Sequence, residues 1–155
     1  MKSPAHDYPP IIAAIAVHGA AEAIEFYKNA FGATERYRLV DPDSGKIGHA
    51  ELNLNGSMFM LSDENPQWNK SPQTLNGTTV KFCLMVENAD VAIEKAVAAG
   101  ATPLMPAGDM FYGYRCGTVR DPFGHEWLLE HVIEEVSPEE MQRRWDAMGS
   151  QCNAD

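Results

Sequence analysis

Residues 23–34 read AIEFYKNAFGAT, and residues 92–102 read AIEKAVAAGAT. In the first stretch Ile24, Tyr27 and Phe31 follow the spacing of one apolar helix face. Each stretch reaches a glycine, which favours a left-handed helix cap. The shared AIE and GAT motifs, in the same order, indicate that the chain contains one structural unit twice.

The segments around these two helices are also similar. An apolar run of strand length precedes each helix, at 11–17 (IIAAIAV) and 80–86 (VKFCLMV). A turn-forming Asp-Pro segment follows each helix, at 41–45 and 121–124. Three strands are expected after each helix, at 35–40, 46–54 and 57–62, and again at 102–105, 115–120 and 126–133. The repeated unit is therefore βαβββ.

The predicted fold class is α+β, with paired βαβββ modules that form a curled mixed sheet, followed by a C-terminal helix. We expect a single domain over 1–155, divided into a first module (9–62), a linker (63–77), a second module (78–135) and a terminal helix (136–150). Ser137-Pro138-Glu139-Glu140 is typical of a helix start. The stripe of Met141, Trp145 and Met148 on this helix is expected to pack on the domain or on a second subunit.

Composition excludes several kinds of partner. The chain has 155 residues, with 12 basic and 22 acidic side chains and a formal net charge of −10. Such a surface repels nucleic acid and anionic membranes. No run approaches the roughly 20 apolar residues of a membrane helix, and the prolines within residues 1–10 do not fit a signal peptide. Cys83, Cys116 and Cys152 form no CxxC motif, so we expect a reducing, cytoplasmic location.

Four segments carry a resemblance to a known family: AIEFYKNAFGA, GHAEL, DMFYGYRCGTVRDPFGHEW and VSPEEMQRR. With the repeat, they resemble the vicinal oxygen chelate superfamily, which includes glyoxalase I, extradiol dioxygenases, and fosfomycin and bleomycin resistance proteins. More narrowly, they look like its PhnB-like branch. The resemblance covers about 9–135. It implies a homodimer and, in the metal-using members, four side chains that hold a divalent ion inside the curled sheet.

Apart from Glu51, the four metal-ligand positions that this resemblance assigns hold unsuitable residues. They fall on Ile12, Glu51, Lys81 and Leu128. Isoleucine and leucine have no lone pair to donate, and a protonated lysine repels a cation, whereas such a site needs three or four O or N donors at about 2–2.3 Å. We therefore predict no metal and no other cofactor.

Strand alternation gives the first candidate site. Ala50, Leu52 and Leu54 are expected to pack under the helix, which leaves His49 and Glu51 on the cavity side. Glu51 is the candidate catalytic residue, and His49 is a candidate ligand-binding residue that could orient it. By the same alternation Lys81 faces the cavity, where its ammonium is expected to neutralise Glu51.

The second candidate is the predicted loop 105–116, which gathers aromatic and charged side chains around Gly113, expected to be flexible. Asp109, Tyr112 and Arg115 are the candidate ligand-binding residues there, because an aromatic wall with one charge of each sign suits a small amphipathic molecule. Burial of this loop against a dimer partner is the alternative. His125 is expected to be a turn residue.

The residues leave two functions open. One is a metal-free protein that binds a small, cationic or aromatic molecule, as bleomycin resistance relatives do. The other is a lyase, isomerase or dioxygenase-type enzyme that acts on a small carbonyl or epoxide, with Glu51 as metal ligand or general base. A stable domain whose activity has decayed is a third interpretation. In each case the expected partners are a small molecule and a second copy of the chain.

Overall fold

The computed structural model describes residues 8–152. Residues 1–7, which hold most of the N-terminal stretch considered above, and residues 153–155 lie outside this range. Within it, no helix is long and apolar enough to cross a membrane.

The unit predicted from the sequence repeat is present twice. The first comprises β1 (Ala13–Val17), α1 (Ala20–Phe31), β2 (Thr34–Val40), β3 (Ile47–Leu54) and β4 (Ser57–Asp63). The second comprises β5 (Lys81–Met85), α3 (Ala89–Ala98), β6 (Thr102–Asp109), β7 (Tyr114–Arg120) and β8 (Glu126–Val132). The short helix α2 (Pro72–Leu75) lies within the predicted linker, and α4 (Pro138–Cys152) is the predicted C-terminal helix.

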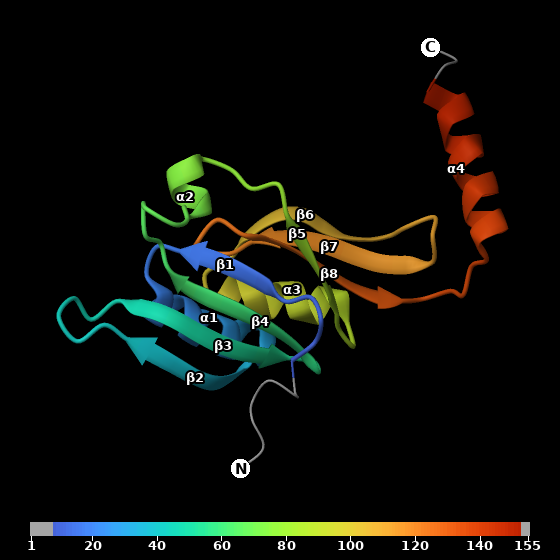
Figure 1. Cartoon of the computed structure of the whole chain (residues 1–155). Helices are drawn as coiled ribbons and strands as arrows, with labels where there is room; N and C mark the ends of the chain where they lie inside the picture. Colours follow the sequence, from blue (N-terminus) through green and yellow to red (C-terminus); the bar gives the residue numbers. More distant parts are fainter. Residues whose placement is uncertain (1–7, 153–155) are drawn as a thin grey trace.

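Each unit folds into its own four-stranded mixed sheet. The strand orders are β1-β4-β3-β2 and β5-β8-β7-β6, in which the first strand of each unit pairs in parallel with the last. Helix α1 packs on the first sheet and α3 on the second, and the two helices also contact each other (Figure 1). The α+β prediction with paired βαβββ modules is therefore confirmed, although the two sheets do not close into one barrel.

The core lies on the helix side of both sheets and is continuous between the two units. Tyr27 and Phe59 from the first unit meet Trp127 from the second, with Tyr27–Trp127 and Phe59–Trp127 ring centroids 5.5 and 6.1 Å apart. The expected strand faces are confirmed, because Ala50, Leu52 and Leu54 are all buried in this core. In each sheet, the face opposite the helix is called the open face below.

Helix α4 projects away from both sheets and approaches the rest of the chain only near the β6–β7 hairpin (Figure 1). Arg144 ties it there by donating a hydrogen bond from Nη1 to the Phe111 carbonyl oxygen, at 2.9 Å, and by pairing with Glu134. The apolar stripe is largely uncovered, since Trp145 and Met148 are 60% and 48% exposed.

The prediction of a loop over 105–116 is wrong for most of this range. Strand β6 continues to Asp109 and β7 begins at Tyr114, so only four residues lie between the strands of this hairpin. Gly113 is tightly held, because its carbonyl oxygen accepts hydrogen bonds from the Ile133 and Glu134 N–H groups. A Cβ at this position would lie 2.2 Å from the Glu134 carbonyl oxygen, so the close approach of the two segments requires glycine here.

Candidate functional site

Glu51 is the most unusual polar residue of the structure. It lies on β3, on the open face of the first sheet, yet its side chain is only 1% exposed. Its Oε1 atom accepts hydrogen bonds from the hydroxyl groups of Tyr8 and Tyr37, both at 2.8 Å. The His49 Nε2 atom lies 3.2 Å from the same oxygen. The structure therefore brings the predicted pair His49 and Glu51 together.

The other carboxylate oxygen of Glu51 has a different environment. Oε2 is buried and accepts no hydrogen bond from residues 8–152. The Arg36 Nη1 atom lies 3.2 Å from it, but the hydrogen bond that this atom makes goes from one of its two N–H groups to the Met58 sulfur. The contact is therefore an ion pair without a hydrogen bond, and a buried acceptor without a donor is costly.

A β-bulge brings two of these groups to Glu51. The β2–β3 register shifts between Glu35 and Tyr37, so that Glu35 lies opposite Leu52 and Tyr37 lies opposite Glu51. The intervening Arg36 has no pairing partner on β3. Because a bulge re-aims side chains, both Arg36 and Tyr37 reach the open face at Glu51.

These neighbours keep the Glu51 carboxyl group ionised. Burial alone would raise its pKa, but the hydrogen bonds from Tyr8, Tyr37 and His49 and the charge of Arg36 outweigh burial and lower it. The reciprocal effect raises the pKa of Tyr37 to about 12, chiefly through its hydrogen bond to Glu51. At neutral pH Glu51 is thus a carboxylate and Tyr37 a neutral hydrogen-bond donor.

A cavity of about 580 Å³ adjoins this cluster. Tyr8, Pro9 and Ile11 from the segment before β1 line it together with Arg36, and Asn53 lies on the β3 side. No acidic side chain lines the cavity within the described residues, although the chain as a whole is acidic. Its volume suits a small organic molecule.

The expected pairing of Lys81 with Glu51 is wrong. Lys81 lies on β5 in the second sheet, where its Nζ atom is 3.8 Å from a Glu126 carboxylate oxygen and its side chain is 47% exposed. Arg36 is the cation beside Glu51 instead. Alternation along one strand predicts which face a side chain takes, but not which sheet lies across from it.

The three hairpin residues form a separate group, away from Glu51. Arg115 pairs with Asp109 at 2.8 Å and with Asp90 of α3 at 2.6 Å, so its charge is already neutralised. Tyr112 contacts the Cys116 sulfur at 3.4 Å. Burial, followed by the hydrogen bond to Cys116, raises the pKa of Tyr112. This arrangement ties the hairpin to α3.

On the open face of the second sheet, the structure does not support Cys83 as a reactive thiol. Burial, followed by the charge of Glu130, raises the pKa of the Cys83 thiol, which favours the unreactive protonated form.

His125 is buried, and its Nε2 atom lies 3.0 Å from the Ala16 carbonyl oxygen. The turn that contains His125 thus contacts β1.

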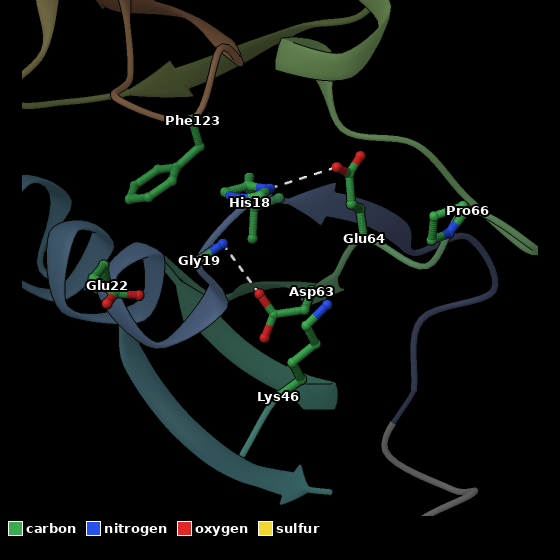
Figure 2. A pocket seen from close by; sticks show the side chains of 9 residues that line it. His18, Gly19, Glu22, Lys46, Asp63, Glu64, Pro66 and Phe123 are labelled. Carbon is green, nitrogen blue, oxygen red and sulfur yellow. Dashed lines mark hydrogen bonds and ion pairs between the residues drawn. The ribbon is translucent and has the colours of Figure 1, made fainter. Parts of the chain in front are cut away.

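Figure 2 shows a second cavity, of about 510 Å³, at the start of α1. Its Asp63 carboxylate accepts hydrogen bonds from the Gly19, Ala20 and Ile47 N–H groups. Glu64 in turn accepts hydrogen bonds from the Ser71 N–H and the Thr74 hydroxyl. Both carboxylates are therefore engaged in holding α1 and α2, and the Glu51 cluster remains the better candidate site.

The donor set does not fit a metal ion of the kind that the resemblance implies. Among residues 8–152, no three His, Cys, Asp or Glu side chains are grouped so that they could hold a metal. Glu51 is the carboxylate at one of the four assigned positions, and its Oε1 atom already accepts three hydrogen bonds. Ile12, Lys81 and Leu128 add no ligand at the other three.

Fold and sequence comparison together define the class. Residues 11–129 match the model of the Glyoxalase/Bleomycin resistance protein/Dioxygenase superfamily, and the chain belongs to this superfamily. An uncharacterised protein of Mycobacterium bovis is 39% identical over 145 residues, covering 91% of this chain and 95% of its own length. These relationships agree with the resemblance carried by the repeat.

Solved structures extend the comparison. An Arabidopsis thaliana gene product is 31% identical, with a TM-score of 0.66 over 79% of this chain and 98% of that one. TioX from Micromonospora sp. ML1 is 25% identical, with a TM-score of 0.61 over 83% of this chain and 100% of that one. A PhnB protein from Bacillus cereus, 21% identical with a TM-score of 0.62 over 80% of this chain and 100% of that one, shares the fold.

Three members of the site, Tyr8, Arg36 and Tyr37, were missed by sequence reasoning. Tyr8 lies 43 residues before Glu51, in a proline-containing segment without helix or strand periodicity. Arg36 reaches the site only because of the bulge in β2. A signal was present in residues 35–38 (ERYR), which place charged and aromatic side chains next to one another on an expected strand.

Proposed function

We propose that the chain binds a small organic molecule on the open face of its first sheet, without a resident metal or other cofactor, and that Glu51 anchors this molecule. The observation that carries the proposal is the asymmetry of the Glu51 carboxylate. Oε1 accepts three hydrogen bonds, whereas the buried Oε2 accepts none, and two residues in contact with Glu51, Tyr8 and Arg36, line the adjoining cavity. A ligand N–H or O–H group that reaches Oε2 would satisfy it.

The same geometry gives less support to an enzyme that uses Glu51 as a general base on a carbonyl or epoxide. A base needs a pKa near the working pH and a free lone pair directed at the substrate proton. Although Oε2 has free lone pairs, the three hydrogen bonds to Oε1 and the charge of Arg36 outweigh burial and lower the pKa of Glu51. A carboxylate of this kind accepts hydrogen bonds well but takes up a proton poorly.

A comparison of two isosteric variants tests this proposal. Ligand-observed NMR with a fragment library is run on the wild type, on Glu51→Gln, and on Glu126→Gln as a control carboxylate on the second sheet. We expect a group of fragments that bind the wild type and Glu126→Gln but lose binding in Glu51→Gln. If every fragment that binds the wild type binds Glu51→Gln equally well, Glu51 is not the anchor.

Elemental analysis tests the proposal that the protein holds no resident metal. Protein purified without chelator is analysed and then titrated with zinc, nickel, manganese and iron(II). We expect less than stoichiometric metal and no change in titration between the wild type and Glu51→Gln. A stoichiometric ion that is lost in Glu51→Gln would overturn the proposal in favour of a metal enzyme.

We further propose a homodimer in the cytoplasm. Apolar side chains are exposed on the open face and on α4, among them Leu39 at 59% and Trp145 at 60%, and a second copy would cover them. The formal charge of −10 disfavours nucleic acid as an additional partner. Light scattering at micromolar concentration tests the dimer, and a monomeric mass would exclude it.

A further inference from the structure

Tyr8 differs from the other two hydrogen-bond donors to Glu51. Tyr37 and His49 belong to paired strands, with Tyr37 opposite Glu51 and His49 opposite Leu39 in the β2–β3 ladder. Tyr8 precedes β1 and lies outside any helix or strand. Its hydroxyl reaches Glu51 across 43 residues of sequence. The strand donors are therefore fixed by the sheet, whereas Tyr8 is added from outside it.

The Glu51 site does not need Tyr8 to satisfy Oε1. A carboxylate oxygen offers about two lone pairs, and the Tyr37 hydroxyl and the His49 ring nitrogen are already directed at Oε1. The Tyr8 ring also lies against Arg36, with the guanidinium carbon 5.3 Å from the ring centroid. Such a cation–π contact favours an aromatic ring at this position. Tyr8 thus makes the two contacts that an aromatic ligand with a hydroxyl group would make, one with Glu51 and one with Arg36.

We propose that Tyr8 is an internal occupant of the ligand site, and that the ligand is a phenol whose ring and hydroxyl group take the place of the Tyr8 side chain. This inference rests on the proposed function, because it uses the same Glu51 anchor. In the ligand-bound protein the phenol hydroxyl would take the place of the Tyr8 hydroxyl at Glu51 Oε1, and the ring would stack on Arg36, while Oε2 stays available to a second donor group of the ligand.

The adjoining cavity indicates which substituents the phenol can carry. Within residues 8–152, the Nε and Nη2 groups of Arg36 donate no hydrogen bond to protein, and neither does the Asn53 amide. Both residues line the 580 Å³ cavity next to the Tyr8 ring. Unused donors suit a ring substituent with acceptor oxygens, such as a carboxylate or a carbonyl.

A tethered occupant must weaken ligand binding in the wild type. A ligand binds only the fraction of molecules whose Tyr8 has left the site, so its apparent affinity falls by that fraction. Removing the Tyr8 side chain should therefore strengthen binding of any molecule that imitates it. Because Tyr8 is only partly buried and lies outside the core, its removal leaves the fold intact.

The probe is p-cresol, which is the tyrosine side chain without its backbone, and toluene is the matched control without the hydroxyl. Binding of both is measured by protein-observed NMR on the wild type, Tyr8→Ala, and Tyr8→Ala with Glu51→Gln. We expect p-cresol to bind Tyr8→Ala about tenfold or more tightly than the wild type. Toluene should bind Tyr8→Ala at least about tenfold more weakly than p-cresol, and the double variant should lose the p-cresol gain.

Equal p-cresol affinity in the wild type and Tyr8→Ala would overturn the assignment of Tyr8 as an occupant. Equal affinity of toluene and p-cresol for Tyr8→Ala would overturn the phenol class. Both results leave the Glu51-dependent fragments of the previous experiment in place, so this inference can fail while the proposed function stands. Failure of the proposed function is recognised separately, when Glu51→Gln changes the binding of no fragment.

Discussion

The Tyr27 hydroxyl donates a 2.7 Å hydrogen bond to the Asp121 carboxylate, and this bond joins the helix of the first unit to the turn of the second. The same carboxylate accepts the Trp127 indole N–H at 2.9 Å and the Phe123 and His125 backbone N–H groups. Burial, followed by the charge of Asp121, raises the pKa of Tyr27, so it remains a donor over the accessible pH range. The two units are therefore held together by a polar contact inside the shared apolar core.

Tyr27→Phe tests this contact. The variant keeps the ring but removes one hydrogen bond to a buried carboxylate, so we expect a loss of about 1.5–3 kcal/mol in the free energy of unfolding. Urea denaturation monitored by circular dichroism measures the loss. A variant as stable as the wild type would show that packing alone joins the two units.

A close approach of α3 to the second sheet gives a steric prediction. A Cβ on Gly117 of β7 would lie 2.5 Å from the Ile93 side chain and 2.8 Å from the Met105 carbonyl oxygen. We expect Gly117→Ala to destabilise the fold by about 1–3 kcal/mol, because helix and strand must move apart. Gly48→Ala on β3, where a Cβ meets nothing within 4 Å, is the matched control. Equal thermal stability of the two variants would contradict the packing described.

The pKa of Glu35 predicts acid sensitivity. The hydrogen bond from Arg38, helped by a hydrogen bond from Lys28, outweighs burial and lowers the pKa of Glu35 from 4.5 to about 2. Because the folded-state pKa lies below the unfolded one, the stabilisation is present above pH 4.5 and is lost as the pH falls toward about 2. We expect Glu35→Gln to flatten the decrease in unfolding free energy over this range, as followed by urea denaturation. An unchanged pH profile would exclude this contribution.

The attachment of α4 depends on Arg144, which pairs with Glu134 and Glu140 and donates to the Phe111 carbonyl oxygen. We expect Arg144→Gln to speed hydrogen exchange in α4, since the helix has few apolar contacts with the rest of the chain besides the Trp145 ring, which lies 5.5 Å from the Phe111 ring. Arg143→Gln is the control, because Arg143 pairs only with Glu140 among the described residues and is 70% exposed. If both variants exchange alike, another contact holds the helix.

Sequence alone predicted the fold well, because the repeat and the strand alternation are local signals. The alternation at Ala50, Glu51 and Leu52 assigned each side chain to its correct face. The strand expected over 102–105 was too short, because it continues to Asp109 through Pro103 and Pro106, residues that are typical of loops. In the structure β6 is an edge strand whose register shifts twice near these prolines, and an edge with bulges accommodates them.

The site was predicted only in part, for a physical reason. His49 and Glu51 are two residues apart on one strand, so their contact follows from the strand period. The contact of Arg36 with Glu51 depends on one extra residue in β2, which shifts the β2–β3 register and leaves no mark in the composition. Tyr8 depends on the path of a segment that no periodic pattern specifies. Contacts between distant segments require the folded chain.

We propose that Glu51 acts as an ionised hydrogen-bond acceptor rather than as a proton-accepting base. The most direct test is a pH titration of the Glu51 side-chain carboxyl carbon by ¹³C NMR in the wild-type protein, assigned with Glu51→Gln. We predict a pKa below the ordinary 4.5, because the donors Tyr8, Tyr37 and His49 and the charge of Arg36 outweigh burial. A pKa above 4.5 would mean that burial dominates, and would contradict the role of Glu51 as an ionised acceptor.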